Sequence, residues 1–334
     1  MYRGLFFLIA FLIPSFTASN GQSATPPSGA NVAPATPQAG DSSPATPARP
    51  ENWNELSLSK SGLNTASYSA VVLGKGEEAD YTRELVRVQW RRGDPIDIYV
   101  VLPHGVSKPP AILYLYDYRY GTERFRDNGW CGRATKGGFA AVGITSALSF
   151  ERIRSPRPRK QWFVSELEEA LGASTHDVQM ILNYLASRGD IDMGRVGMFA
   201  QGSGGAVAVL AAAVDSRIAV LDLLDPWGDW PDWMKDSPQI PEDERGNYLQ
   251  PEFLKKVAGL DPVKYIPQLP VRALRIQQVR TEPVTPASAK EKIAAATLPP
   301  EQTVWYEDAA AHAAAWRTEG LGGWIRQQLS PASK

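Results

Sequence analysis

Short apolar runs alternate with helical patterns through most of this chain, and the alternation limits what the chain can fold into. The runs are rich in Val, Ile, Leu and Ala, and a short continuous apolar run is typical of a strand buried on both faces. We expect strands at 84–91, 96–102, 111–116, 138–144, 196–200, 219–224, 274–279 and 303–306, and helices at 130–136, 166–188, 205–214 and 314–329. This order predicts an α/β domain with a mainly parallel central sheet and helices on both of its faces.

Three segments depart from this alternation. Residues 1–19 carry Arg3 before an apolar run that ends in small residues, which predicts a signal peptide and a secreted or periplasmic protein. Residues 20–50 are rich in Pro, Ala, Ser and Thr, a composition typical of a disordered linker. The remaining residues, 51–334, are expected to form one domain. Within it, 226–270 interrupts the alternation after the sixth expected strand, and we interpret it as a cap insertion.

The charge and cysteine content narrow the class of protein. The 334 residues include 35 Lys and Arg against 36 Asp and Glu, so the net charge is close to zero. Nucleic-acid-binding proteins usually carry a basic excess, and we therefore expect no nucleic-acid partner. Cys131 is the only cysteine, so no intrachain disulfide can form, and we expect it to be a small buried residue. No pattern predicts a metal or another cofactor. The N-terminal apolar run is shorter than the ~20 residues that span a bilayer, so we expect no stable membrane span after signal cleavage.

The most specific segment is a strand followed by a glycine-rich turn and an alanine-rich helix. Its centre reads Ala200-Gln201-Gly202-Ser203-Gly204-Gly205. This segment resembles the nucleophile elbow of the α/β-hydrolases, where the nucleophile stands between two small residues. Dienelactone-hydrolase-like and prolyl-oligopeptidase-like members are the most similar, and the resemblance covers most of 82–330. It implies the α/β-hydrolase fold and a serine-hydrolase-like activity on esters or small peptide bonds.

Two alignments of this turn give it different chemistry. In the first, Gly202 stands at the nucleophile position, so the turn is kept, the attacking oxygen is lost and the backbone N–H of Ser203 is an oxyanion donor. In the second, the turn slips by one residue and Ser203 attacks, which forces Gln201 into a crowded position. We favour the first alignment, and the sequence leaves both open.

The resemblance also implies positions for the acid and the base of a catalytic triad. Glu282 follows the seventh expected strand, where the acid of the family commonly stands, and Asp225 is a second, less well matched acid. His312 follows the last expected strand, which completes the order nucleophile, acid, histidine. The two other histidines, His104 and His176, are interpreted as surface or capping residues.

The loop after the strand at 111–116 departs from the family pattern. The family often has His-Gly at this position, next to a second oxyanion donor, but this chain has Asp117 and Tyr118. A carboxylate beside a forming oxyanion opposes its negative charge. If Ser203 attacks, the backbone N–H groups of Tyr118 and Gly204 are the expected oxyanion donors.

Three functions remain open on the sequence. The first is a catalytically impaired α/β-hydrolase that keeps its pocket for binding. The second is a working serine hydrolase, in which His312 takes the proton of Ser203 and Glu282 orients His312. The third is a glycan- or polymer-binding protein built around the tryptophans of 227–233. The expected partner is a small-molecule ester, amide or glycan-like ligand.

Overall fold

The computed structural model describes residues 50–63, 69–91, 93–118, 120–148, 152 and 166–330. The predicted signal peptide and nearly all of the predicted linker lie outside these residues. In the described part of the chain, no helix combines the length and the apolar character needed to cross a membrane.

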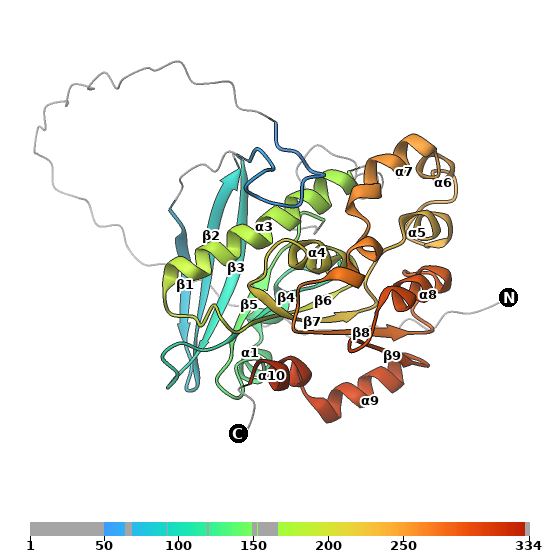
Figure 1. The fold of residues 1–334 in the computed structure, drawn as a ribbon. Helices are drawn as coiled ribbons and strands as arrows, with labels where there is room; N and C mark the ends of the chain where they lie inside the picture. Colours follow the sequence, from blue (N-terminus) through green and yellow to red (C-terminus); the bar gives the residue numbers. More distant parts are fainter. Residues whose placement is uncertain are drawn as a thin grey trace, which may run out of the picture. The chain divides into compact units, whose positions relative to one another are not determined.

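A nine-stranded sheet forms the centre of the described chain (Figure 1). Its strands are β1 (Val71–Glu77), β2 (Tyr81–Arg91), β3 (Asp94–Pro103), β4 (Ala111–Leu115), β5 (Ala140–Ile144), β6 (Val196–Gln201), β7 (Ile218–Leu224), β8 (Ala273–Val279) and β9 (Gln302–Tyr306). They stand in the order β1-β2-β3-β5-β4-β6-β7-β8-β9. The pairs from β1 to β5 are antiparallel, and those from β5 to β9 are parallel. The carboxyl ends of β4, β6 and β7 therefore lie side by side, at the edge where such sheets bind ligands.

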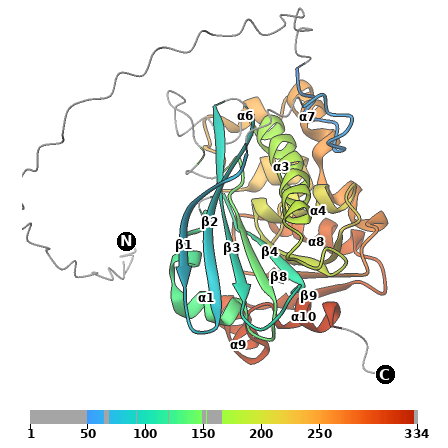
Figure 2. The same ribbon diagram turned by 90° about the vertical axis from the view of Figure 1, so that its left-hand side faces the viewer.

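Helices cover both faces of the sheet (Figure 2). One face packs against α3 (Leu167–Arg188), α4 (Ser203–Ala212) and α8 (Ala287–Ala296). The other face packs against α1 (Asn128–Ala134), α9 (Ala309–Glu319) and α10 (Gly323–Leu329). The segment between β7 and β8 forms α5 (Trp230–Asp236), α6 (Arg245–Tyr248), α7 (Pro251–Val257) and three short 3₁₀ turns. The two apolar layers explain why the central strands are apolar on both faces.

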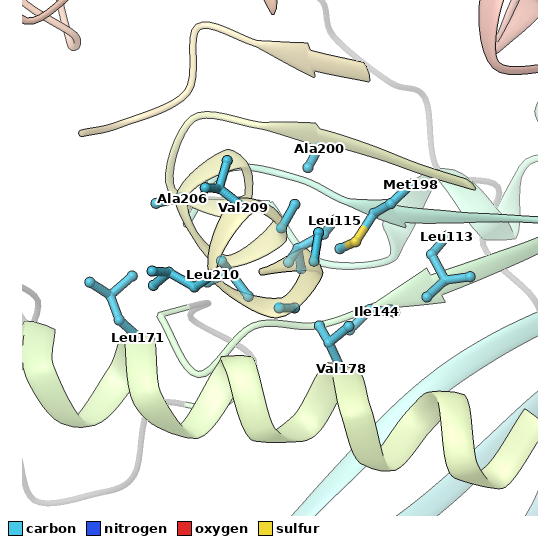
Figure 3. Packing of buried hydrophobic residues seen from close by; sticks show 14 of the residues in the cluster. Leu113, Leu115, Ile144, Leu171, Val178, Met198, Ala200, Ala206, Val209 and Leu210 are labelled. Atoms are coloured by element: carbon cyan, nitrogen blue, oxygen red, sulfur yellow. The ribbon is translucent and has the colours of Figure 1, made fainter. Parts of the chain in front are cut away.

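The helix α4 lies at the centre of the larger of the two apolar layers (Figure 3). Every residue of α4 is buried, and its small side chains allow the helix to lie close to the sheet on one side and to α3 on the other. Gly204 is required for this approach, because a Cβ atom there would overlap the backbone carbonyl group of Leu115 on β4. This packing fixes the turn before α4 against the end of β4.

Most of the expected elements are confirmed, whereas α8 was not predicted and two further regions differ. All eight predicted strands are present, but the sequence reasoning missed β1 because Val71, Val72 and Leu73 are exposed on an edge strand without a buried face. The predicted helix at 314–329 is wrong. The chain instead forms α9 and α10, because Gly320 and Gly322 adopt positive φ angles that end one helix and start the next.

The tryptophans of the region after β7 are core residues. Trp227, Trp230 and Trp233 are 1%, 1% and 0% exposed, and the rings of Trp227 and Trp233 lie 4.7 Å apart. The expectation that they form a glycan-binding platform is therefore wrong, because a buried ring cannot stack on a sugar. Cys131 is buried, as expected.

Candidate functional site

The turn between β6 and α4 is built on Gly202. This residue has φ 55° and ψ −121°, a conformation that is strained for residues with a side chain and free for glycine. Its N–H donates to the carbonyl of Leu224 at 3.0 Å, and its own carbonyl accepts from Gly205 at 3.0 Å and from Trp227 at 3.0 Å. Ser203 follows as the first residue of α4 and is 0% exposed. The strained position of the elbow thus carries no side chain.

The carboxylate of Asp117 occupies the space beside Gly202. Asp117 follows β4, which pairs with β6 in the sheet. A Cβ atom at Gly202 would lie 2.5 Å from Asp117 Oδ1 and 2.6 Å from its Cγ. The space in which a nucleophile side chain would begin is therefore filled by the chain's own acid.

Three hydrogen bonds hold this carboxylate in place. Asp117 Oδ1 accepts from the backbone N–H of Tyr118 at 2.9 Å, from the backbone N–H of Ser203 at 3.0 Å and from the Ser203 hydroxyl at 2.9 Å. The two N–H groups are expected oxyanion donors. A carboxylate oxygen thus accepts from both of the N–H groups that the sequence predicts as oxyanion donors. We call this arrangement, in which Asp117 lies against Gly202 and bonds to Ser203 and Tyr118, the sealed elbow.

Burial dominates the electrostatics of Asp117. Removal from water raises the pKa of its carboxyl group above the ordinary value, although the Ser203 and Tyr118 donors lower it in part. The charge of Glu282 also raises this pKa. The donors of Ser203 and Tyr118 therefore stabilise the charged form of Asp117, which burial and the charge of Glu282 disfavour.

Glu282, the predicted triad acid, is bound within its own loop after β8. Its carboxylate accepts from the backbone N–H of Val284 at 2.7 Å and from that of Thr285 at 3.1 Å. Lys290 on α8 lies 3.5 Å from Glu282 Oε2, is 1% exposed, and donates to the carbonyls of Val279 and Glu282. These contacts give Glu282 a structural role in its turn.

Asp225, the second candidate acid, is also engaged by the backbone. It has an unusual φ of 43°, and its Oδ1 accepts from the N–H of Val279 at 2.8 Å. Burial raises the pKa of Asp225 to about 7, while Val279 and the nearby Lys290 oppose that rise. In the described part of the chain, no group of three or more His, Cys, Asp or Glu side chains could hold a metal ion.

His312 is the fourth residue of α9, which packs against the opposite face of the sheet from α4. Its ring meets that of Tyr306 edge to face, with the centroids 5.1 Å apart. Its Nε2 atom is buried and has no hydrogen-bond partner in the described chain. Burial, together with the charge of Arg275, lowers the pKa of His312, so the imidazole is neutral at pH 7.

The structure does not join the three predicted triad residues. In the described chain, the hydroxyl of Ser203 bonds to Asp117, Glu282 bonds to its own loop, and no hydrogen bond connects either residue with His312. A catalytic triad requires both of the missing contacts, because the histidine takes the proton of the serine and the acid orients the histidine.

A cavity of about 250 Å³ lies on the α9 face, next to the carboxyl ends of β4, β6 and β7. Its lining includes Tyr116, Arg124, Phe199, Gln201, Leu224, His312 and Trp316. Of the candidate triad, only His312 contributes to this cavity. A role in lining a cavity was not predicted from the sequence for Arg124, Gln201 or Trp316. Two of the lining residues, Tyr116 and Gln201, directly precede Asp117 and Gly202 of the sealed elbow.

His176 is not the surface or capping residue expected from the sequence. It is 0% exposed within α3, and its two ring nitrogens lie 2.6 Å from Glu51 Oε1 and 2.6 Å from the carbonyl oxygen of Glu55. Both neighbours are hydrogen-bond acceptors, one a side-chain oxygen and one a backbone oxygen. His176 therefore fastens the segment before β1 to the domain and takes no part in the site.

The order of the sheet, the elbow after β6 and the helices on both faces define an α/β-hydrolase fold. Solved structures agree. Acetyl xylan esterase 1 from Thermoanaerobacterium sp. matches with a TM-score of 0.61 at 14% identity, over 77% of this chain and 86% of that one. An acetyl xylan esterase from Paenibacillus sp. R4 matches with a TM-score of 0.60 at 16% identity, over 77% and 88%.

A third similar structure is a puromycin-hydrolyzing peptidase from Mycobacterium tuberculosis. Its TM-score is 0.54 at 17% identity, and the match covers 79% of this chain and 47% of that one. No protein-family model and no curated protein matches the sequence. At these identities the likeness establishes the fold, while the chemistry has to be argued from the site.

Proposed function

We propose that this chain is an α/β-hydrolase-fold protein that has lost acyl-transfer catalysis at its elbow and uses the fold to bind a small ligand. The observation that carries the proposal is the position of the Asp117 carboxylate. It fills the space beside Gly202 and accepts hydrogen bonds from the Tyr118 and Ser203 N–H groups. Two requirements of a serine hydrolase, a nucleophile and vacant oxyanion donors, are unmet at once.

The physical chemistry of acyl transfer supports this reading. The tetrahedral intermediate places a negative oxygen between preorganised donors, and loss of one such donor costs about 10²- to 10³-fold in rate. Here both donors face a carboxylate, so a second negative oxygen would meet repulsion as well as missing hydrogen bonds. The substrate would first have to displace Asp117 from its three donors.

The alternative, an active hydrolase that uses Ser203, has less support. The hydroxyl of Ser203 is buried and donates to the Asp117 carboxylate, and in the described chain it has no hydrogen bond to His312, the candidate general base. His312 lines a cavity on the other face of the sheet. Export to the periplasm or the medium also belongs to the proposal, and it rests on the sequence of residues 1–19, which lie outside the described chain.

Hydrolysis of a small aryl ester such as p-nitrophenyl acetate tests the proposal. We expect the wild type and Ser203→Ala to give equal rates, with His312→Gln unchanged as well. Ser187→Ala, at an exposed hydroxyl near the end of α3, is the matched control for a serine substitution. A tenfold or larger loss in Ser203→Ala, with Ser187→Ala unchanged and both variants folded by circular dichroism, would overturn the proposal; a factor of ten corresponds to about 1.4 kcal/mol of barrier.

A further inference from the structure

The cavity under α9 has the chemistry of a carboxylate site. We propose that it binds a small monocarboxylate with an apolar body, and that Arg124 supplies the charged contact. This inference rests on the proposed function, since it takes the cavity to be a ligand-binding site and not a site of hydrolysis.

Arg124 is the cation of this cavity, and it lacks a carboxylate partner in the described chain. It belongs to the 3₁₀ turn Glu123–Arg126, and its guanidinium lies 4.5 Å from the centre of the Tyr116 ring. By contrast, Arg275 on the same side of the sheet is saturated by Asp222 and Glu319. A guanidinium that stacks on an aromatic face still presents its in-plane donors, and these match the two oxygens of a carboxylate.

The other polar groups of the cavity favour an anion over a cation. The lining includes the amide of Gln201 and the imidazole of His312 and no Asp or Glu. Nε2 of His312 is buried without a partner in the described chain, and the ring is neutral at pH 7, so it adds a polar contact without a competing charge. A cationic ligand would meet the charge of Arg124 with no acid among the lining residues to offset it.

The remaining walls call for an apolar body. Phe199 and Leu224 contribute from β6 and β7, and the ring of Phe199 packs edge to face on Tyr116 with centroids 6.1 Å apart. Trp316 lies one helical turn after His312 on α9, so both side chains are on the same face of that helix.

The volume of the cavity indicates how large a group it can hold. A volume of about 250 Å³ equals the share of about eight waters in the liquid, or roughly ten non-hydrogen atoms of a ligand. A phenylacetate-sized acid fits this volume.

Titration calorimetry and ligand-observed NMR with two probes test the inference. Phenylacetate is the anionic probe, and phenylacetamide is its neutral counterpart of the same shape. We expect phenylacetate to bind the wild type at least tenfold more tightly than phenylacetamide. Arg124→Gln should weaken phenylacetate by about 10- to 100-fold and leave phenylacetamide unchanged, since a charge-assisted hydrogen bond is lost. Arg317→Gln is the matched control, because Arg317 is an exposed arginine on α9 that does not line the cavity, and this variant should bind like the wild type.

Three results would overturn the inference. They are equal affinities for the two probes, an Arg124→Gln protein that keeps its affinity for phenylacetate, and no binding of phenylacetate at about 10 mM, a concentration that would detect a Kd in the millimolar range. None of these results restores hydrolysis, so they leave the sealed elbow standing. Conversely, Ser203-dependent ester hydrolysis would contradict the proposed function but would not contradict binding of a carboxylate by Arg124.

Discussion

Removal of the Asp117 carboxylate should destabilise the protein far more than removal of an ordinary helix cap. In Asp117→Ala, the hydroxyl and the N–H of Ser203 lose their acceptor, and so does the N–H of Tyr118. Ser203 is 0% exposed, so water does not readily replace the lost oxygen. A buried donor without an acceptor costs about 1–3 kcal/mol, so the two donors of Ser203 together cost about 2–6 kcal/mol.

Part of this cost is offset. Burial raises the pKa of Asp117, so the native state also gains when the charge is removed. We therefore expect a net loss of about 3 kcal/mol for Asp117→Ala and about 1 kcal/mol for Asp117→Asn, which keeps an acceptor at Oδ1.

Urea unfolding measures the difference, provided that the slope m is unchanged. Asp127→Ala is the matched control, because Asp127 caps α1 with one hydrogen bond to the N–H of Trp130. Loss of such a cap costs about 1 kcal/mol. An Asp117→Ala protein that loses no more stability than Asp127→Ala would refute the reasoning that three donors converge on this carboxylate.

Three further predictions follow from single positions. Gly202→Ala should lose about 2–4 kcal/mol in thermal unfolding, because its Cβ would lie 2.5 Å from Asp117 Oδ1 at a φ of 55°. Asp225→Asn should flatten the pH dependence of stability between about pH 4 and 7. The folded carboxyl, with its pKa raised to about 7, keeps a proton that the unfolded one has lost, so wild-type stability falls as the pH rises through this window. Gly172→Ala should speed limited proteolysis of the segment that carries Trp53, because its Cβ would overlap the Trp53 backbone.

Matched substitutions keep these predictions falsifiable. Gly189 also has a positive φ, 74°, but open space around it, and a Cβ atom added at Gly246 would meet no atom within 4 Å. Gly202→Ala must therefore cost more than Gly189→Ala, and Gly172→Ala must differ from Gly246→Ala. For Asp225→Asn, the change in the urea-derived free energy of unfolding between pH 4.5 and 7.5 should be smaller than in the wild type, and parallel pH profiles would contradict the assigned proton.

The central sheet could be predicted from the sequence because its signal is local. Runs such as 111–116 and 196–200 are apolar throughout, which is typical of a strand between two helical layers. The exposed edge strand β1 has no such signal, since Val71 and Val72 do not alternate with polar residues around a buried face. The break between α9 and α10 was missed because glycine permits a positive φ without requiring one.

The candidate site was predictable only in part. Gly202 and Asp117 each stood out as departures at positions where the fold places a nucleophile and an oxyanion donor. The sequence does not reveal that these two residues lie in contact. Their contact depends on the pairing of β4 with β6 and on the direction of the Asp117 side chain beyond the end of β4. The sequence order of Ser203, Glu282 and His312 could not reveal that His312 lies on the α9 face, because loop paths set that direction.

The most direct test of the sealed elbow is labelling of the full-length protein with a fluorophosphonate, followed by peptide mass mapping. Such probes modify a serine only when it is activated as a nucleophile. With Asp117 at the oxyanion donors and Gly202 at the strained position, we predict no adduct on the peptide that contains Ser203. An adduct on Ser203 of the wild type that disappears in Ser203→Ala would contradict the account.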